Sequence, residues 1–286
     1  MSVEPRKPKV LLFDIGGVCV QSPFQAILDY ELSLGIPPGW VNYSLSKTSP
    51  NGYWHKLERG EIALDQDFIK GFNHDLHDPD RWRAFYSRER SKNPGLPAQT
   101  PPVPSIDGDW LFHEMMYHSS FPDPWMYPAL QKLKASGHYI LAALSNTVIF
   151  PPGHRFHTEG SFGNPVKSIF DVFVSSAHVG IRKPDPRMYQ YALREVDSFA
   201  KSHAHEARAT GKGWDAGVKP QDILFLDDIG ENLKEARNQG FRTLKVNLGR
   251  AYEAVEELER VTGLQLEGGH PKNPIKPQLG GSKAKM

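Results

Sequence analysis

The chain has 286 residues, enough for one large domain or for a core domain with a smaller one. Hydrophobic residues make up 39%, an ordinary composition that allows a sizeable core. The 34 basic and 33 acidic residues leave a formal net charge of +1, which gives no reason to expect general attraction to nucleic acid or to an anionic membrane. Cys19 is the one cysteine, so no intramolecular disulfide can form, and we interpret it as a small packed residue.

The two ends of the chain bear on location. Residues 1–9 are short and polar and lack the apolar stretch of a signal peptide. No run approaches the roughly 18 to 20 apolar residues that a membrane span needs. We therefore expect a cytoplasmic protein with no membrane partner. The last residues, Ala284-Lys285-Met286, loosely resemble the small-basic-Leu peroxisomal address, so a peroxisomal location is the alternative.

Five apolar runs predict buried strands, since continuous hydrophobicity is typical of strands covered on both faces of a parallel sheet. These runs are residues 10–13, 140–144, 172–174, 223–226 and, more weakly, 243–246. Amphipathic helical patterns alternate with them, at residues 128–136, 187–196, 231–239 and 251–261. This alternation predicts an α/β fold, a Rossmann-like doubly wound parallel sheet.

The first and second predicted strands are more than 100 residues apart, too far for one crossover helix. Because the insert contains amphipathic helical stretches, we predict a helical cap domain over residues 21–107. The predicted core domain comprises residues 1–20 and 108–265, and a disordered tail rich in Gly, Pro and Lys covers residues 266–286. A second polar insert, at residues 199–219, has no assigned role.

Polar side chains follow the predicted strands where those strands end. Asp14 follows the first strand, Ser145 and Asn146 the second, and Asp227 with Asp228 the fourth. Ligands of open α/β sheets bind beyond the carboxyl ends of the strands. We therefore expect these side chains to converge on one site.

These residue types suit phosphoryl transfer. A carboxylate nucleophile, Asp14, is repelled by a phosphoryl group unless cations intervene. Asp14 and Asp228 together can hold Mg²⁺, which favours oxygen ligands, and Lys183 from the loop after the third strand adds a fixed positive charge. Ser145 and Asn146 can donate hydrogen bonds to phosphoryl oxygens. Asp14 can then attack phosphorus and form an aspartyl-phosphate that water cleaves.

Four segments resemble, in order, the motifs of haloacid dehalogenase-like hydrolases. They are residues 13–18 (FDIGGV), 144–147 (LSNT), 180–186 (GIRKPDP) and 225–233 (FLDDIGENL). The resemblance spans residues 9–249. The insert is similar to the helical C1 cap of this family. The closest likeness is to the group that contains the phosphatase domain of soluble epoxide hydrolase and bacterial sugar-1-phosphate phosphatases.

The resemblance implies a metal site and its surroundings. Asp14 would be both nucleophile and Mg²⁺ ligand, with the backbone carbonyl of Gly16 and the side chain of Asp228 as further ligands. Asp227 would be a supporting acid near the metal. Asn232 stands where many relatives have another acid.

The resemblance also implies how substrate is held. Ser145, Asn146 and Lys183 would bind the phosphate of a small phosphorylated molecule. No motif in the cap identifies the rest of the substrate. The sequence does not predict the oligomeric state. Tyr53 and Trp54 would either line the pocket or form the cap's own core.

One departure from the family pattern concerns the proton donor. Phosphatases of this family usually carry a second aspartate two residues after the nucleophile, and this chain has Gly16 there. Losing a general acid slows the departure of a poor leaving group, typically by roughly 10²-fold or more. Either the substrate has a good leaving group, or another group or water supplies the proton, or the enzyme is not a phosphatase.

Two alternative functions follow from Gly16. Hydrolytic dehalogenation of a haloacid through an aspartyl ester needs no proton donor, but it leaves the acidic pair Asp227-Asp228 unexplained. A binding or regulatory module that has lost turnover is the other alternative, and the intact Asp14, Lys183 and Asp228 argue against it. His154 and His157 follow the second motif, and we interpret them as parts of a solvated loop.

Overall fold

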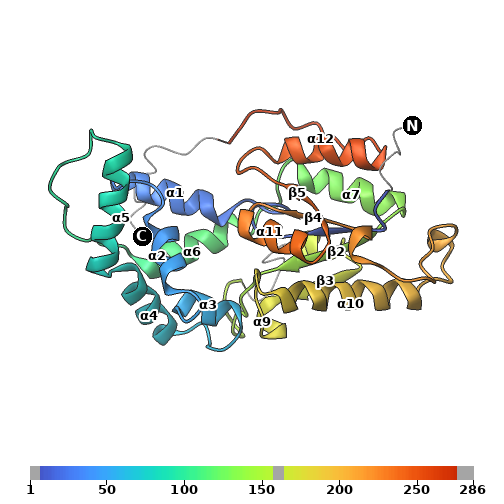
Figure 1. The fold of residues 1–286 in the computed structure, drawn as a ribbon, viewed down its shortest axis with the longest axis horizontal. Coiled ribbons are helices and arrows are strands. Elements are labelled where there is room, and N and C mark those ends of the chain that lie inside the picture. The colour runs from blue at the N-terminus through green and yellow to red at the C-terminus, as the bar shows by residue number, and fades with distance from the viewer. Residues whose placement is uncertain (1–6, 157–163, 276–286) are drawn as a thin grey trace.

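The computed structural model describes residues 7–156 and 164–275, and it consists of a helix-covered sheet with a group of helices beside it (Figure 1). Five strands form the sheet in the order β3-β2-β1-β4-β5, and all neighbouring strands are parallel. The strands are β1 (Val10–Phe13), β2 (Ile140–Ser145), β3 (Val172–Ser175), β4 (Ile223–Asp227) and β5 (Arg242–Lys245). The five predicted strands and the α/β class are confirmed.

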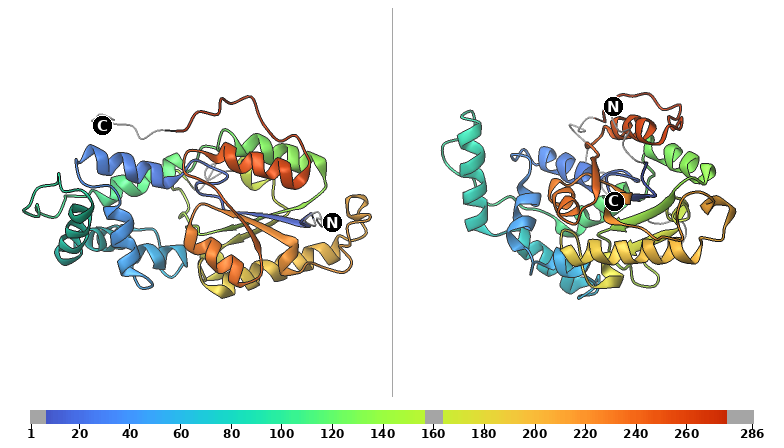
Figure 2. Two further views of the ribbon diagram at one scale, coloured as in Figure 1. Left: turned by 45° about the horizontal axis from the view of Figure 1, so that its top comes forward. Right: turned by 45° about the vertical axis from the view of Figure 1, so that its right-hand side comes forward.

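Helices cover both faces of this sheet (Figure 2). Leu11 and Phe13 of β1 pack in the cluster that includes residues of α7 and α12, whereas Val10 and Leu12 pack with residues of α10 and α11. Successive side chains of a strand point to opposite faces, so all four residues are buried and the strand is apolar throughout. The helices that follow β1 in the sheet domain are α7 (Met126–Ser136), α8 (Asn164–Lys167), α9 (Ser176–Val179), α10 (Pro186–Ser202), α11 (Gly230–Asn238) and α12 (Ala251–Thr262).

Six helices between β1 and β2 build a second hydrophobic cluster, separate from the sheet. They are α1 (Pro23–Ser33), α2 (Trp40–Thr48), α3 (Tyr53–Glu58), α4 (Gln66–Leu76), α5 (Pro79–Lys92) and α6 (Gly108–His118). Aromatic rings fill much of this cluster. Trp54 lies with its ring centroid 5.8 Å from that of Phe72 and 6.1 Å from that of Phe112, so it is part of the core of these helices.

The helix starts follow from local sequence. Five residues cap a helix by accepting a hydrogen bond from an N–H of its first turn: Ser22, Asp65, Asp78, Asp107 and Asp185. Proline also occupies the first turn of α1, α5 and α10, where its missing N–H has no intrahelical partner to lose.

We propose that the cap comprises α1 to α6 and so extends past the predicted boundary at residue 107. The reason is α6, whose buried residues Leu111, Phe112, Met115 and Met116 belong to the cap cluster. The sequence of α6 does not show which of the two clusters its apolar face joins, so the predicted boundary at residue 107 leaves this helix in the core.

Two segments have more order than their composition suggests. In the polar insert at 199–219, Lys9 Nζ donates to the carbonyls of Gly213 at 2.6 Å and Gly217 at 2.7 Å, which ties the insert to the start of β1. In the predicted tail, Leu266 is fully buried and Trp125 Nε1 donates to the carbonyl of Pro271 at 3.1 Å. Disorder therefore stays a prediction for residues 276–286, which lie outside the described residues. This segment includes the tripeptide 284–286, which resembles a peroxisomal address.

Within residues 7–156 and 164–275, none of the helices combines the length and the apolar character needed to cross a bilayer.

Candidate active site

Three carboxylates meet at the carboxyl ends of β1 and β4. Asp14 follows β1, Asp227 is the last residue of β4, and Asp228 follows it. Each offers one oxygen within 4.8 Å of the others. Asp14 is fixed by two hydrogen bonds: its N–H donates to the Leu226 carbonyl at 2.8 Å, and the N–H of Ile15 donates to its Oδ1 at 2.6 Å.

Lys183 joins two of these carboxylates. It comes from the loop between α9 and α10, and its side chain is fully buried. Its Nζ lies 2.9 Å from Asp14 Oδ2 and 2.7 Å from Asp227 Oδ2. Burial opposes its charge, but Asp14 and Asp227 outweigh this effect and raise the pKa of Lys183 above its usual value. The ammonium group therefore stays charged between the two carboxylates.

Asp227 is held by three donors. Besides Lys183, the N–H of Ile229 donates to Oδ1 at 2.7 Å, and Asn232 Nδ2 lies 3.1 Å from Oδ1 and 3.0 Å from Oδ2. Burial raises the pKa of Asp227 to about 6, against the lowering effect of Lys183. The donors favour the carboxylate form. Asn232 thus supports Asp227, a contact that an acid at position 232 would turn into repulsion.

Asp228 carries the unsatisfied oxygen of the site. Its Oδ1 is buried without a hydrogen-bond partner among the described residues. Burial, with the nearby charges of Asp14 and Asp227, raises the pKa of Asp228 well above its usual value. A buried unpaired oxygen is unfavourable unless something binds it. Clustered oxygen donors with one free oxygen fit a hard cation such as Mg²⁺.

Gly17, three residues after Asp14, makes room for Asp228. Gly17 has φ +74°, and a Cβ there would lie 2.5 Å from Asp228 Oδ2, so glycine is required for both conformation and space. Gly16 pairs with Val20 in an isolated parallel bridge. The predicted role of the Gly16 carbonyl as a metal ligand stays a prediction.

Two of the three residues predicted to bind phosphate lie at the carboxyl end of β2, where Ser145 is its last residue and Asn146 follows it. Ser145 is buried, with its Oγ 3.4 Å from the carbonyl of Asn146. The Asn146 side chain holds the backbone of Lys183, because its Oδ1 accepts from the Lys183 N–H at 2.8 Å and its Nδ2 donates to the Lys183 carbonyl at 3.1 Å. Asn146 therefore positions Lys183, and contact of Ser145 and Asn146 with phosphate stays a prediction.

Cap residues that the sequence did not single out reach this region. Glu58, the last residue of α3, pairs with Arg182, the residue before Lys183, at 2.7 Å. His55 of the same helix is buried, and burial, followed by the charges of Arg182 and Arg59, lowers its pKa to about 4. A short helix carrying one buried acid has no periodicity that predicts such a contact.

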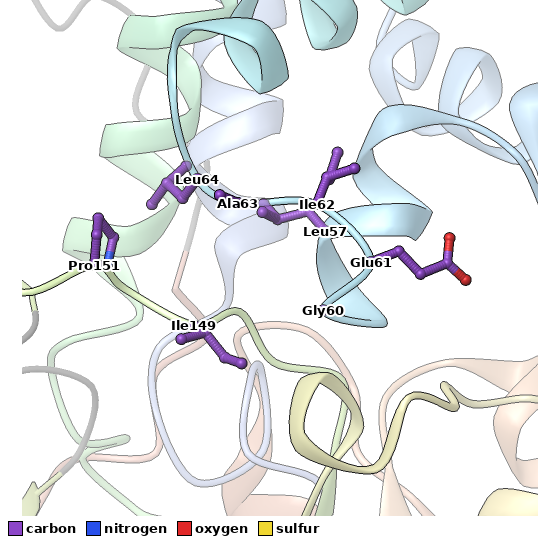
Figure 3. A pocket seen from close by; sticks show the side chains of 8 residues that line it. All are labelled: Leu57, Gly60, Glu61, Ile62, Ala63, Leu64, Ile149 and Pro151. Atoms are coloured by element: carbon purple, nitrogen blue, oxygen red, sulfur yellow. The ribbon is translucent and has the colours of Figure 1, made fainter.

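A cavity of about 270 Å³ lies between the cap and the loop after β2 (Figure 3). Its walls are the cap residues Leu57, Gly60, Glu61, Ile62, Ala63 and Leu64, and the loop residues Ile149 and Pro151. Asp14 and Lys183 are not among the lining residues. In the sequence, Glu58 directly follows the lining residue Leu57, and Ile149 comes three residues after Asn146.

The remaining predicted residues lie as follows. Cys19 is fully buried, as predicted, with its Sγ 3.1 Å from the Asp14 carbonyl. His154 is half-buried and its ring stacks on those of His113 and Phe150, so the predicted solvated loop packs on the cap instead. His157 lies outside the described residues.

A family model described as haloacid dehalogenase-like hydrolase matches residues 8–240. The chain is 27% identical over 275 residues to acyl-CoA dehydrogenase family member 10 of Mus musculus, covering 96% of this chain and 21% of that protein. It is 25% identical over 269 residues to bifunctional epoxide hydrolase 2 of Mus musculus, covering 93% of this chain and 40% of that protein. It is also 28% identical over 130 residues to (S)-2-haloacid dehalogenase 4A of Burkholderia cepacia, covering 45% of this chain and 44% of that protein.

The chain thus spans about a fifth and two fifths of the length of the two mouse proteins. The family model, in contrast, covers most of the chain and includes all four sequence motifs and the residues that meet at the carboxyl ends of β1 and β4. The chain belongs to the haloacid dehalogenase-like hydrolase family.

Proposed function

We propose that this hydrolase is a Mg²⁺-dependent phosphatase of a small phosphorylated metabolite, with Asp14 as nucleophile. The observation that carries the proposal is the position of Lys183 Nζ between Asp14 and Asp227, in a carboxylate cluster that also holds Asp228 with its unpaired oxygen. One positive charge among three carboxylates leaves this cluster negative. A phosphoryl anion would be repelled there unless a cation were bound.

Asp14 and Asp228 are the side chains that would hold Mg²⁺, with the Gly16 carbonyl as the further ligand that the family pattern implies. When bound, Mg²⁺ would neutralise negative charge on the phosphoryl oxygens. The Asp227 carboxylate already accepts hydrogen bonds from Lys183, Ile229 and Asn232. This supports a role for Asp227 near the metal without direct binding to it.

The protein groups would act in two steps. A carboxylate oxygen of Asp14 attacks phosphorus, the ester P–O bond breaks, and the departing oxygen takes a proton from water. Water then attacks the phosphorus of the aspartyl-phosphate, so that phosphate leaves and Asp14 is regenerated. Lys183 keeps its charge throughout and stabilises the charge that builds on the transferred group.

The departing alcohol would lie toward the cavity between residues 57–64 and Ile149. Its lining is largely apolar, and its one charged residue, Glu61, is neutralised by Arg59 at 2.6 Å. Arg59 lowers the pKa of Glu61 and so keeps it in the carboxylate form, which leaves these walls without a proton donor and favours a substrate whose leaving group departs without strong acid assistance.

Haloacid dehalogenation is the second candidate, and Gly16 and the similarity to the Burkholderia cepacia dehalogenase favour it. In that reaction Asp14 would displace halide from carbon, and the ester would then be hydrolysed. Attack on a neutral carbon needs no divalent cation, so the unpaired Asp228 oxygen would have no use.

The test is a panel of phosphomonoesters and 2-haloacids, each assayed with Mg²⁺ and with EDTA, on the wild type and on Asp14→Asn. Phosphate release that needs both Mg²⁺ and Asp14 is the expected result. Halide release that persists in EDTA would replace the phosphatase proposal with the dehalogenase one. The absence of both products would indicate a binding module.

A further inference from the structure

We infer that Glu58 of the cap is a positioning residue for Lys183, acting through Arg182. The inference rests on the proposed function, in which Lys183 must stand beside Asp14. The two ends of this connection belong to different parts of the fold, since Glu58 ends α3 in the cap and Arg182 lies in the loop before α10 (Figure 1).

The Glu58–Arg182 pair is largely shielded from water. Glu58 Oε2 lies 2.7 Å from Arg182 Nε, and the side chains are 8% and 20% exposed. Burial raises the pKa of Glu58, while Arg182, Trp54 and Lys183 oppose that shift. Breaking a buried pair leaves one charge without a partner, unlike breaking an exposed pair, whose charges water solvates. The position of Glu58 therefore constrains the position of Arg182.

The end of α3 touches a second core loop at the same time. Ser176 Oγ donates to the backbone carbonyl of Glu58 at 2.5 Å, and it accepts from the N–H of Thr147 at 2.9 Å. Two residues beyond Glu58, Gly60 approaches the carbonyl of Ala177 so closely that no side chain fits between them. The cap thus meets both the loop after β2 and the loop after β3.

A fixed Arg182 also restricts the position of Lys183, which belongs to the site. Lys183 is the next residue, and both its N–H and its carbonyl are bonded to Asn146, which adjoins Thr147. Its Nζ then reaches Asp14 and Asp227. The Lys183 backbone is thus held by Asn146 directly and by Glu58 through Arg182, and Glu58 belongs to the cap. When α3 is in this position, the Lys183 backbone is held on both sides.

This arrangement makes catalysis depend on the cap in a specific way. Loss of the Glu58 charge would release Arg182 and loosen the Lys183 loop, without removing any group that touches the reacting atoms. Small displacements of a charged group lower the rate of the chemical step more than they lower substrate affinity. The effect should therefore fall on kcat and not on KM.

The chain offers a matched control for this pair. Glu206 Oε2 lies 2.7 Å from Arg208 Nε, the same atom types at the same distance as in the Glu58–Arg182 pair. This control pair lies in the 199–219 insert, which is tied to Lys9 at the start of β1 and thus to the opposite end of the sheet. Glu206→Gln removes an equivalent charge far from Lys183.

The test compares Glu58→Gln, Arg182→Gln, the double variant and Glu206→Gln, using p-nitrophenyl phosphate with Mg²⁺. We expect each single variant at 58 or 182 to lower kcat about tenfold, since misplaced groups slow the chemical step, with KM changed less than about threefold. The double variant should lose no more than either single one, because both remove one interaction. Glu206→Gln should stay within about twofold of the wild type.

Hydrogen exchange of the peptide covering residues 180–186 gives a readout that does not depend on turnover. Faster exchange in Glu58→Gln than in Glu206→Gln is expected. Equal exchange, equal kcat in these two variants, or losses that multiply in the double variant would each overturn the positioning role. If the wild type hydrolyses no phosphomonoester, the proposed function fails and the exchange comparison still decides whether Glu58 orders the Lys183 loop.

Discussion

The carboxylate of Asp228 occupies the space that a side chain on residue 17 would need. A Cβ on Gly17 would lie 2.5 Å from Asp228 Oδ2, and Gly17 has φ +74°. The loop after the nucleophile and the loop after β4 can therefore approach each other only because residue 17 has no side chain.

Gly17→Ala should lower kcat/KM by about 100-fold or more, because Asp228 must move away from the proposed Mg²⁺ position. Gly35→Ala is the control, since Gly35 has φ +66° with no atom within 4 Å of a built Cβ and so tests backbone strain alone. Steady-state kinetics on both variants make the comparison. Equal activity in the two would show that the Gly17 contact is irrelevant.

Sequence patterns predicted the sheet and its carboxyl edge well. Residues 10–13 and 223–226 are continuously apolar because helices cover both faces, and Asp14 and Asp227 end these runs where loops begin. Glu58 was not predicted, because its partner Arg182 is brought to it only by the packing of α3 on the core. The contact of Asn146 with phosphate stays a prediction, and the hydrogen bonds of its amide to the Lys183 backbone are a further role that only tertiary geometry reveals.

Lys183→Met should destabilise the metal-free protein by about 3 to 5 kcal/mol, since it leaves the buried carboxylates of Asp14 and Asp227 without their counter-charge. The free energy of unfolding in urea measures this. Lys201→Met breaks a pair of similar length, Lys201 Nζ to Asp197 Oδ2 at 2.8 Å, but these side chains are 55% and 29% exposed. That variant should lose at most about 1 kcal/mol, and a similar loss in both would argue against a strong buried pair.

His55 should make stability depend on pH in the weakly acidic range. Its pKa is lowered from 6.5 to about 4 by burial first and by Arg182 and Arg59 next. Between pH 4 and 6.5 the His55 side chain binds a proton in the unfolded chain but not in the folded chain. The free energy of unfolding therefore decreases as the pH falls from 6.5 toward 4, and His55 takes nothing from it above pH 6.5.

The slope of unfolding free energy against pH in that window should fall in His55→Gln by up to about 1 kcal/mol per pH unit. His138→Gln, at an exposed position, is the control and should keep the wild-type slope. Urea denaturation at pH 4.5 and 7 measures both. An unchanged slope in His55→Gln would mean that His55 titrates alike in the folded and unfolded chain.

Mg²⁺ should raise the melting temperature, because a ligand that binds only the folded protein stabilises it in proportion to the logarithm of its concentration. The shift should vanish in Asp228→Asn, which removes the charge of the unpaired carboxylate. Asp215→Asn, in the distant insert, should keep the shift. Thermal melts over a Mg²⁺ series test this, and an undiminished shift in Asp228→Asn would place the cation elsewhere.

Trapping the phosphorylated enzyme tests directly whether Asp14 is the nucleophile. Wild-type protein is mixed with Mg²⁺ and a phosphomonoester that it turns over, quenched in acid within milliseconds, digested and sequenced by mass spectrometry. One added phosphoryl group is expected on Asp14, absent in Asp14→Asn and absent in EDTA. Turnover without any phosphorylated aspartate, or with the group on another residue, would contradict it.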